Sequence, residues 1–130
     1  MELHHVGVAT PDAAALAATL GELFGLRVVH EERFEDLLVT FLDAGGTHLE
    51  LLEPARDVGT VARFLDREGP GVHHVALATP DLAGVLAALR DANVETVDDD
   101  PRPGAWGHSV AFLHPDAVGG VLVELVEAGA

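Results

Sequence analysis

The chain has 130 residues, of which 22 are acidic and seven are basic, and its formal net charge is −15. This charge argues against nucleic acid and anionic membrane surfaces as partners, because both are polyanions. Since the sequence has no cysteine, disulfides, thiolate metal sites and cysteine nucleophiles are excluded, and histidines and carboxylates are left to bind any metal. A basic leader with an apolar run and an apolar segment of membrane length are both missing, so we expect a cytoplasmic protein.

One stretch of the sequence occurs twice. Residues 3–12 read LHHVGVATPD, and residues 72–81 read VHHVALATPD. The segments that close the two halves also correspond, LELLE at 49–53 with VELVE at 123–127, and VTFL at 39–42 with VAFL at 110–113. Two copies suit paired modules better than a solenoid, which needs more repeats. We therefore expect one domain, with module one over residues 1–56, a linker helix over 57–70 and module two over 71–130.

The first module is expected to begin with a strand over residues 3–9, whose alternation places His5, Gly7 and Ala9 on one face. The sequence TPD at 10–12 then predicts a helix start, with threonine as the cap and proline at the first helical position, and Gly25 is expected to end that helix. Strands are predicted over residues 27–32, 38–42 and 47–53, with a turn at Gly45 and Gly46 between the last two.

The second module repeats this order. A helix is predicted after TPD at 79–81, ending at Asn93, and strands are predicted over 94–97, 109–113 and 120–127. Residues 58–68 are predicted to form a linker helix, stopped by GPG at 69–71, and residues 101–107 are predicted to be a loop. Each module is thus β-α-β-β-β, and the fold class is α+β.

Glu50 and Glu124 are the residues least expected from their surroundings, because each lies inside an apolar strand. A buried carboxylate must be protonated, paired with a cation or bound to a metal. Each module also begins with a histidine on the small-residue face, His5 or His74, and the repeat would bring all four side chains together. Two imidazoles and two carboxylates suit a divalent cobalt, manganese, nickel, zinc or iron ion. His4 and His73 face the other way, which favours a structural or supporting role.

These segments resemble the vicinal-oxygen-chelate superfamily, whose paired βαβββ modules form a cupped mixed sheet around a divalent metal. Within it, the chain is similar to the methylmalonyl-CoA epimerase family. The narrower likeness rests on GAWG at 104–107, FLHP at 112–115 and GGVLVEL at 119–125. The resemblance implies His5, His74 and Glu124 as metal ligands, with Glu50 as the fourth. It also places Val39 where some epimerases carry a glutamate proposed as a base.

The implied reaction is inversion of C2 of methylmalonyl-CoA through a metal-stabilised enolate, with Glu50 and Glu124 as the candidates for proton transfer. The expected partners are a small acyl-CoA substrate and a second copy of the chain in a homodimer. Candidate substrate-binding residues are those of the loop before the second-last strand: Arg102, Gly104, Trp106, Gly107 and His108. Two alternatives stay open, a glyoxalase I type lactoylglutathione lyase and a non-catalytic small-molecule-binding protein of the same fold.

Overall fold

The computed structural model describes residues 1–129. It divides into two compact units, the first formed by residues 5–73 and the second by residues 1–4 together with the chain from residue 74 onward. The strands and helices, two of them 3₁₀ helices (η), follow in the order β1 (Glu2–Ala9), α1 (Ala13–Phe24), β2 (Arg27–Phe34), β3 (Leu37–Asp43), β4 (His48–Pro54), α2 (Thr60–Glu68), β5 (Gly71–Ala78), α3 (Leu82–Asp91), β6 (Arg102–Pro103), η1 (Ala105–Gly107), β7 (Ser109–Phe112), η2 (Pro115–Val118) and β8 (Val123–Glu127).

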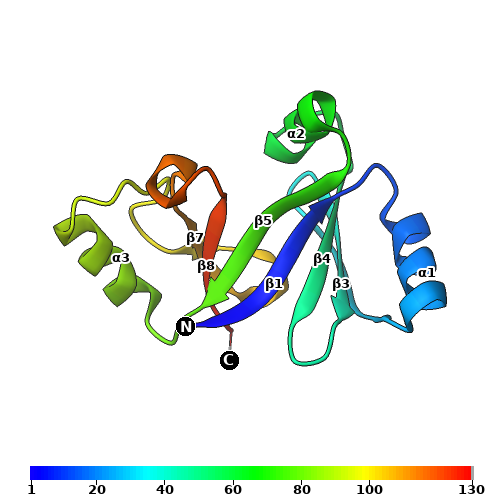
Figure 1. The fold of residues 1–130 in the computed structure, drawn as a ribbon, viewed down its shortest axis with the longest axis horizontal. Helices are drawn as coiled ribbons and strands as arrows, with labels where there is room; N and C mark the ends of the chain where they lie inside the picture. Colours follow the sequence, from blue (N-terminus) through cyan, green and yellow to red (C-terminus); the bar gives the residue numbers. More distant parts are fainter. Residues whose placement is uncertain (130) are drawn as a thin grey trace. The chain divides into compact units, whose positions relative to one another are not determined.

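The first unit contains strands in the order β2-β3-β4-β1 (Figure 1). The β2-β3 and β3-β4 pairs are antiparallel, whereas β4 and β1 are parallel. Helix α1 packs on one face of these strands, where Ala13 of the helix meets Leu42 and Leu51 of the sheet. The opposite face carries His5, because the burial of β1 alternates and buries His5, Gly7 and Ala9. The predicted division of β1 into two faces is therefore confirmed.

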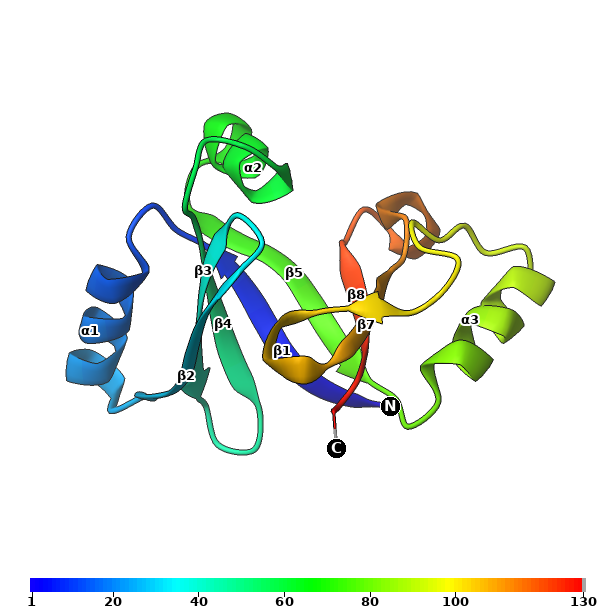
Figure 2. The same ribbon diagram turned by 180° about the vertical axis from the view of Figure 1, so that it is seen from behind.

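The second unit repeats this arrangement with strands in the order β5-β8-β7-β6. Strands β5 and β8 are parallel, and β8-β7 and β7-β6 are antiparallel. Helix α3 buries Leu82 and Leu86 against Ala111 and Leu125 of the strands. Figure 2 shows this helix beside β7 and β8 from behind. The predicted order β-α-β-β-β thus holds in both modules, with differences at the helix starts and in the second strand of module two.

Helices α1 and α3 begin two residues later than predicted. The N-cap residues are Asp12 and Asp81, and their carboxylates accept the backbone N–H of Ala15 and Gly84 at 3.0 Å. The threonines were wrongly predicted as caps, and the prolines lie outside the helices. Each threonine hydroxyl instead accepts the N–H of the capping aspartate, at 3.2 Å in both modules. An aspartate one residue beyond the proline is the better placed acceptor for the open N–H groups of the first turn.

A glutamate of the neighbouring sheet accepts a second backbone N–H group at the start of each of these helices. The Glu53 carboxylate accepts the N–H of Ala13 at 2.8 Å, and the Glu127 carboxylate accepts the N–H of Leu82 at 2.8 Å. Glu53, next to the end of β4, and Glu127, at the end of β8, therefore tie sheet and helix together. These glutamates point away from the face that carries Glu50 and Glu124, since they lie three residues further along a strand with a period of two.

The strand predicted over residues 94–97 is absent from the described structure, where this stretch makes a single bridge between Thr96 and Leu113. The stretch still lies beside the end of β7, where Val97 N–H donates to the Phe112 carbonyl at 2.8 Å, but the N–H of Phe112 is bound by the side chain of Asp98 at 2.9 Å. A side-chain acceptor of this kind replaces the carbonyl that a regular ladder would supply. On the side away from β8, strand β7 pairs with the two-residue β6, so the prediction of a plain loop over 101–107 is also wrong in part.

Two further boundaries differ from the predictions, because α3 has Ala92 rather than Asn93 as its C-cap and the last strand begins at Val123 rather than at residue 120. Other local predictions agree with the structure. Gly25 ends α1 in the left-handed conformation, with φ of 72°, and the turn between β3 and β4 has Gly45 and Gly46 at positive φ. The linker helix forms as α2 and ends before Gly69. Across residues 1–129, each helix is too short or too polar to cross a membrane.

Candidate metal centre and active site

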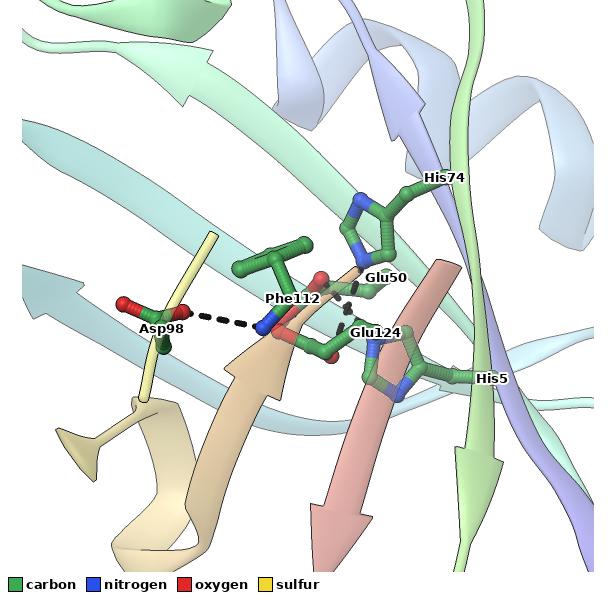
Figure 3. A network of polar contacts seen from close by, with 6 residues as sticks. All are labelled: His5, Glu50, His74, Asp98, Phe112 and Glu124. Atoms are coloured by element: carbon green, nitrogen blue, oxygen red, sulfur yellow. Dashed lines mark hydrogen bonds and ion pairs between the residues drawn. The ribbon is translucent and has the colours of Figure 1, made fainter. Parts of the chain in front are cut away.

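The first unit holds a buried histidine and glutamate pair. His5 of β1 and Glu50 of β4 are 2% and 6% exposed, and the imidazole Nε2 lies 3.2 Å from the carboxylate Oε1 (Figure 3). Glu50 pairs in register with Gly7 of β1. Because Gly7 has no side chain, it leaves room beside the carboxylate. The prediction that small residues line the space next to the second histidine is borne out in this module.

An aromatic ring packs against this pair. Phe41 of β3 is directly opposite Glu50 in the β3-β4 register, and its ring meets the imidazole of His5 edge to face at 5.8 Å between centroids. Phe41 is 1% exposed. A buried aromatic edge holds the imidazole ring in one orientation and keeps water from that side. Strand β3 therefore supports the geometry of the His5 and Glu50 pair.

The second unit builds the same arrangement from its own strands. His74 of β5 and Glu124 of β8 are 3% and 7% exposed, with His74 Nε2 3.8 Å from Glu124 Oε1 (Figure 3). Ala76 is opposite Glu124 in the β5-β8 register, and Phe112 is opposite it in the β7-β8 register. The Phe112 ring meets the His74 imidazole at 5.8 Å and 83°. Each unit thus contains a histidine, a small residue, a glutamate and a phenylalanine in corresponding positions.

The two phenylalanines are functional neighbours that the sequence analysis did not assign. The signal was present, because VTFL and VAFL align in the repeat and place Phe41 and Phe112 at the same position. A phenylalanine in an apolar strand is most often an ordinary core residue, so its identity alone carries no information about a site. The strand register is what places each ring against an imidazole.

The side chains in these pairs have the chemistry of metal ligands. Each unit offers one buried imidazole and one buried carboxylate, His5 with Glu50 in the first and His74 with Glu124 in the second. Imidazole nitrogen and carboxylate oxygen together suit divalent ions of the first transition series. A bound cation would also compensate the burial of two carboxylates, which is otherwise costly. The donor set and its burial therefore fit the divalent ion that the sequence predicts.

Arg102 is the predicted substrate-binding residue with the clearest anchoring. Its Nε donates to Asp98 at 3.0 Å, and its guanidinium carbon lies 5.4 Å from the centroid of the Phe112 ring. Asp98 itself accepts the N–H of Phe112 (Figure 3). The cation is therefore fixed beside the ring that packs against His74. Its side chain is 43% exposed, so the guanidinium is accessible to an anionic ligand.

The loop after Arg102 is held close to β7. The backbone of Gly104 leaves no room for a side chain, because a Cβ there would lie 2.7 Å from Cγ1 of Val110. Trp106 and Gly107 have positive φ values of 59° and 70°. The glycine at 104 is thus required for close approach, and this loop has a fixed backbone rather than a freely variable one.

His108 occupies a different environment from Arg102. Its ring contacts that of His4 at 4.8 Å, and its Nδ1 accepts the N–H of Gly129 at 3.1 Å. The Trp106 ring lies 6.0 Å away. His4 is on the face of β1 opposite His5, as predicted, and its structural role stays a prediction. The roles of Trp106 and His108 in substrate binding stay predictions.

Comparison with known proteins adds independent information. Residues 4–112 match the family model of the glyoxalase/bleomycin resistance protein/dioxygenase superfamily. The uncharacterised protein YqjC of Bacillus subtilis is 38% identical over 96% of this chain and 91% of its own length. The ethylmalonyl-CoA/methylmalonyl-CoA epimerase of Cereibacter sphaeroides is 33% identical over 95% of each chain. A solved methylmalonyl-CoA epimerase in complex with methylmalonyl-CoA and NH4+ superposes with a TM-score of 0.93 at 35% identity, covering 99% of this chain and 95% of that one.

Proposed function

The chain belongs to the glyoxalase/bleomycin resistance protein/dioxygenase superfamily and, within it, to the methylmalonyl-CoA epimerase family, and from this premise we propose that it is a metal-dependent epimerase that inverts C2 of methylmalonyl-CoA. The observation that carries the proposal is the buried pair of histidine and glutamate that recurs in both units. Epimerisation consumes no cofactor. It needs a group that makes the hydrogen on C2 more acidic, and groups that remove and return the proton. Histidines and carboxylates in an apolar setting supply both.

In this proposal His5, His74 and Glu124 bind one divalent ion, with Glu50 as the fourth ligand. The four side chains offer two neutral nitrogen donors and two anionic oxygen donors, and all of them are buried. When bound, the ion supplies Lewis acidity that stabilises negative charge on the substrate's oxygens. The support is the donor chemistry, and the identity of the metal stays open among cobalt, manganese, nickel, zinc and iron.

Proton transfer is assigned to carboxylates of the chain. A carboxylate oxygen takes the proton from C2, the C–H electron pair moves into the thioester carbonyl to give an enolate, and a proton is returned to the opposite side of the planar carbon. Glu50 and Glu124 are the candidates. Positioned general acid and base groups typically contribute about 10²- to 10⁴-fold. Phe41 and Phe112 keep the neighbouring imidazoles in place while the charge on the substrate changes.

Substrate binding is assigned to the segment that begins at Arg102. The net charge of −15 would repel an anionic CoA ester, so local cations and backbone N–H groups must attract it. Arg102 is oriented by Asp98 and remains partly exposed, as a binding group for a carboxylate or phosphate should be. Gly104, Trp106, Gly107 and His108 complete the proposed binding segment. The proposal also includes a homodimer, which gel filtration with light scattering would test.

The test is proton NMR of methylmalonyl-CoA in D₂O with metal-stripped protein, before and after addition of cobalt or manganese. We expect loss of the α-proton signal after metal is added. Glu50→Gln and Glu124→Gln should slow this exchange, whereas Glu127→Gln should not, because Glu127 lies in the same strand as Glu124 but faces helix α3. Absence of exchange with every metal would refute the proposal, and turnover of the methylglyoxal-glutathione hemithioacetal in its place would establish a lyase.

A further inference from the structure

Strand β2 carries a histidine and glutamate pair that is separate from the two pairs described above. His30 Nε2 lies 2.8 Å from Glu32 Oε1, and the two side chains are 28% and 27% exposed. They are two residues apart in one strand and so project from the same face. The pair is thus partly shielded by the protein but still accessible to a bound small molecule.

The strand register places this pair on the face that carries Glu50. His30 is opposite Phe41 in the β2-β3 register, and Phe41 is opposite Glu50 in the β3-β4 register. Directly paired residues point to the same side of a sheet. The ring contact between His30 and Phe41, at 6.1 Å between centroids, agrees with this placement. One row of side chains therefore runs across the first unit from His30 through Phe41 to Glu50.

Glu32 belongs to the adjacent row on the same face. It is opposite Val39, which is in turn opposite Leu52, and both of these are buried and apolar. Among Glu32, Val39 and Leu52, Glu32 is the residue with an ionisable side chain. Its neighbour Glu31 is opposite Thr40 and faces the other side of the sheet, toward α1. A carboxylate that is anchored to an imidazole and beside an apolar surface has the surroundings of a proton-transfer group.

The proposed reaction needs such a group. Inversion at a carbon requires proton removal on one side and proton return on the other, and hence two acid or base groups. Glu50 and Glu124 are both assigned to the metal, and a carboxylate engaged by a cation is a weaker base than one that is not. Glu32 has no such assignment. Its partner His30, which is not one of the proposed metal ligands, holds the carboxylate through the 2.8 Å contact.

We propose that Glu32, oriented by His30, exchanges the C2 proton on one side of the substrate, while Glu50 or Glu124 serves the other side. This inference rests on the proposed function. In the forward direction Glu32 accepts the proton as the C–H bond breaks, and the electron pair moves to the thioester oxygen. The second carboxyl group then gives a proton to C2, and the reverse reaction exchanges the two roles. His30 is a positioning residue and transfers no proton to the substrate.

The test compares the two C2 epimers of methylmalonyl-CoA separately, in D₂O with metal bound. In Glu32→Gln we expect inversion to fall about 10²- to 10⁴-fold. The same variant should still exchange the α-proton of one epimer at close to the wild-type rate, since the other carboxylate is intact, and should lose exchange of the other epimer. Glu31→Gln is the matched control, the adjacent residue with the same change of charge on the opposite face, and it should behave as wild type.

A second readout separates proton transfer from binding and stability. Glu32→Gln should keep its metal content, its melting temperature and its affinity for the nitronate form of 2-nitropropionyl-CoA, which resembles the enolate and has no proton to be removed. Glu32→Asp should restore part of the inversion rate. His30→Asn should lower kcat with a smaller effect on KM, because it misdirects the carboxylate without removing it.

Three results would overturn the inference. The first is Glu32→Gln with normal inversion, and the second is equal loss of exchange from both epimers, which would indicate a binding or structural role. The third is a wild-type protein that exchanges neither epimer, which would refute the proposed function itself. The wild type and the variant therefore report on the two proposals separately.

Discussion

The approach of Gly104 to Val110 permits a quantitative test of how the substrate-binding segment is held. In Gly104→Ala the new Cβ would lie 2.7 Å from Cγ1 and 3.1 Å from Cγ2 of Val110, whereas carbon atoms in contact are normally about 3.5 to 4.0 Å apart. Val110 is 5% exposed and has a β-branched side chain with little freedom about χ1. The backbone must therefore move by about 1 Å, at an overpacking cost of about 1 to 3 kcal/mol.

A double-mutant cycle isolates this contact. Val110→Ala removes two buried methyl groups, which costs roughly 2 to 3 kcal/mol from lost burial and the remaining cavity. If the two changes were independent, the double variant would lose about 3 to 6 kcal/mol of the free energy of unfolding. We expect a loss of only about 1 to 3 kcal/mol, because the new methyl group occupies the space that Val110 vacates. The expected coupling, the difference between these two losses, is about 2 to 3 kcal/mol in favour of the double variant.

The assay is urea unfolding of metal-stripped protein, followed by circular dichroism, for the wild type, both single variants and the double variant. Gly107→Ala serves as the control, because a Cβ at 107 meets open space and the cost there comes from its φ of 70°. Paired with Val110→Ala, this control should be additive within about 0.5 kcal/mol. Additivity in the Gly104 and Val110 cycle as well would refute the steric argument.

Three further results are expected. Asp12→Ala and Asp81→Ala should each lower the free energy of unfolding by about 1 kcal/mol in urea titrations, because each removes the acceptor of an N-cap bond. Arg102→Met should raise KM for methylmalonyl-CoA by about 10- to 100-fold in steady-state assays, the range for losing a charged hydrogen bond of about 1.5 to 3 kcal/mol; an unchanged KM would remove Arg102 from the binding site. Cobalt at 100 times its Kd should stabilise the wild type by about 2.7 kcal/mol in thermal unfolding, and His5→Gln or His74→Gln should lose most of that gain at the same cobalt concentration.

The repeat made much of the fold predictable. Once the two HHV segments are aligned, each module must contain the second histidine, the embedded glutamate and the strand between them. The small residues that alternate after His5 then show which face of the first strand carries this histidine. The pairing of His5 with Glu50 and of His74 with Glu124 follows from parallel strands in that register, and both pairs are present.

The structure differs from the sequence-based predictions where two acceptors, from side chains or from the backbone, compete for the same backbone N–H group. Thr10 and Asp12 both carry acceptors near a helix start, and sequence alone does not rank them, whereas the structure gives the N-cap to Asp12. The β-branched residues at 94–97 favour a strand, but Asp98 takes the N–H of Phe112 that a ladder would use. The pair of His30 and Glu32 was missed for another reason, because a strand with alternating charges in one module has no counterpart in the other to single it out.

Strand β4 places one glutamate on each of its faces, and this has a consequence for folding fidelity. Glu50 meets an imidazole on one side, and Glu53 meets the first turn of α1 on the other. If the strand slipped by one residue against β3, every side chain would change sides, so a leucine would face His5 and a carboxylate would be driven into the apolar surface under the helix. The loss of the contact with His5 and the burial of an unpaired carboxylate would both lower the stability of the slipped form. Glu50 and Glu53 therefore favour a single register of β4 against its neighbours. Glu124 and Glu127 have the same effect on β8.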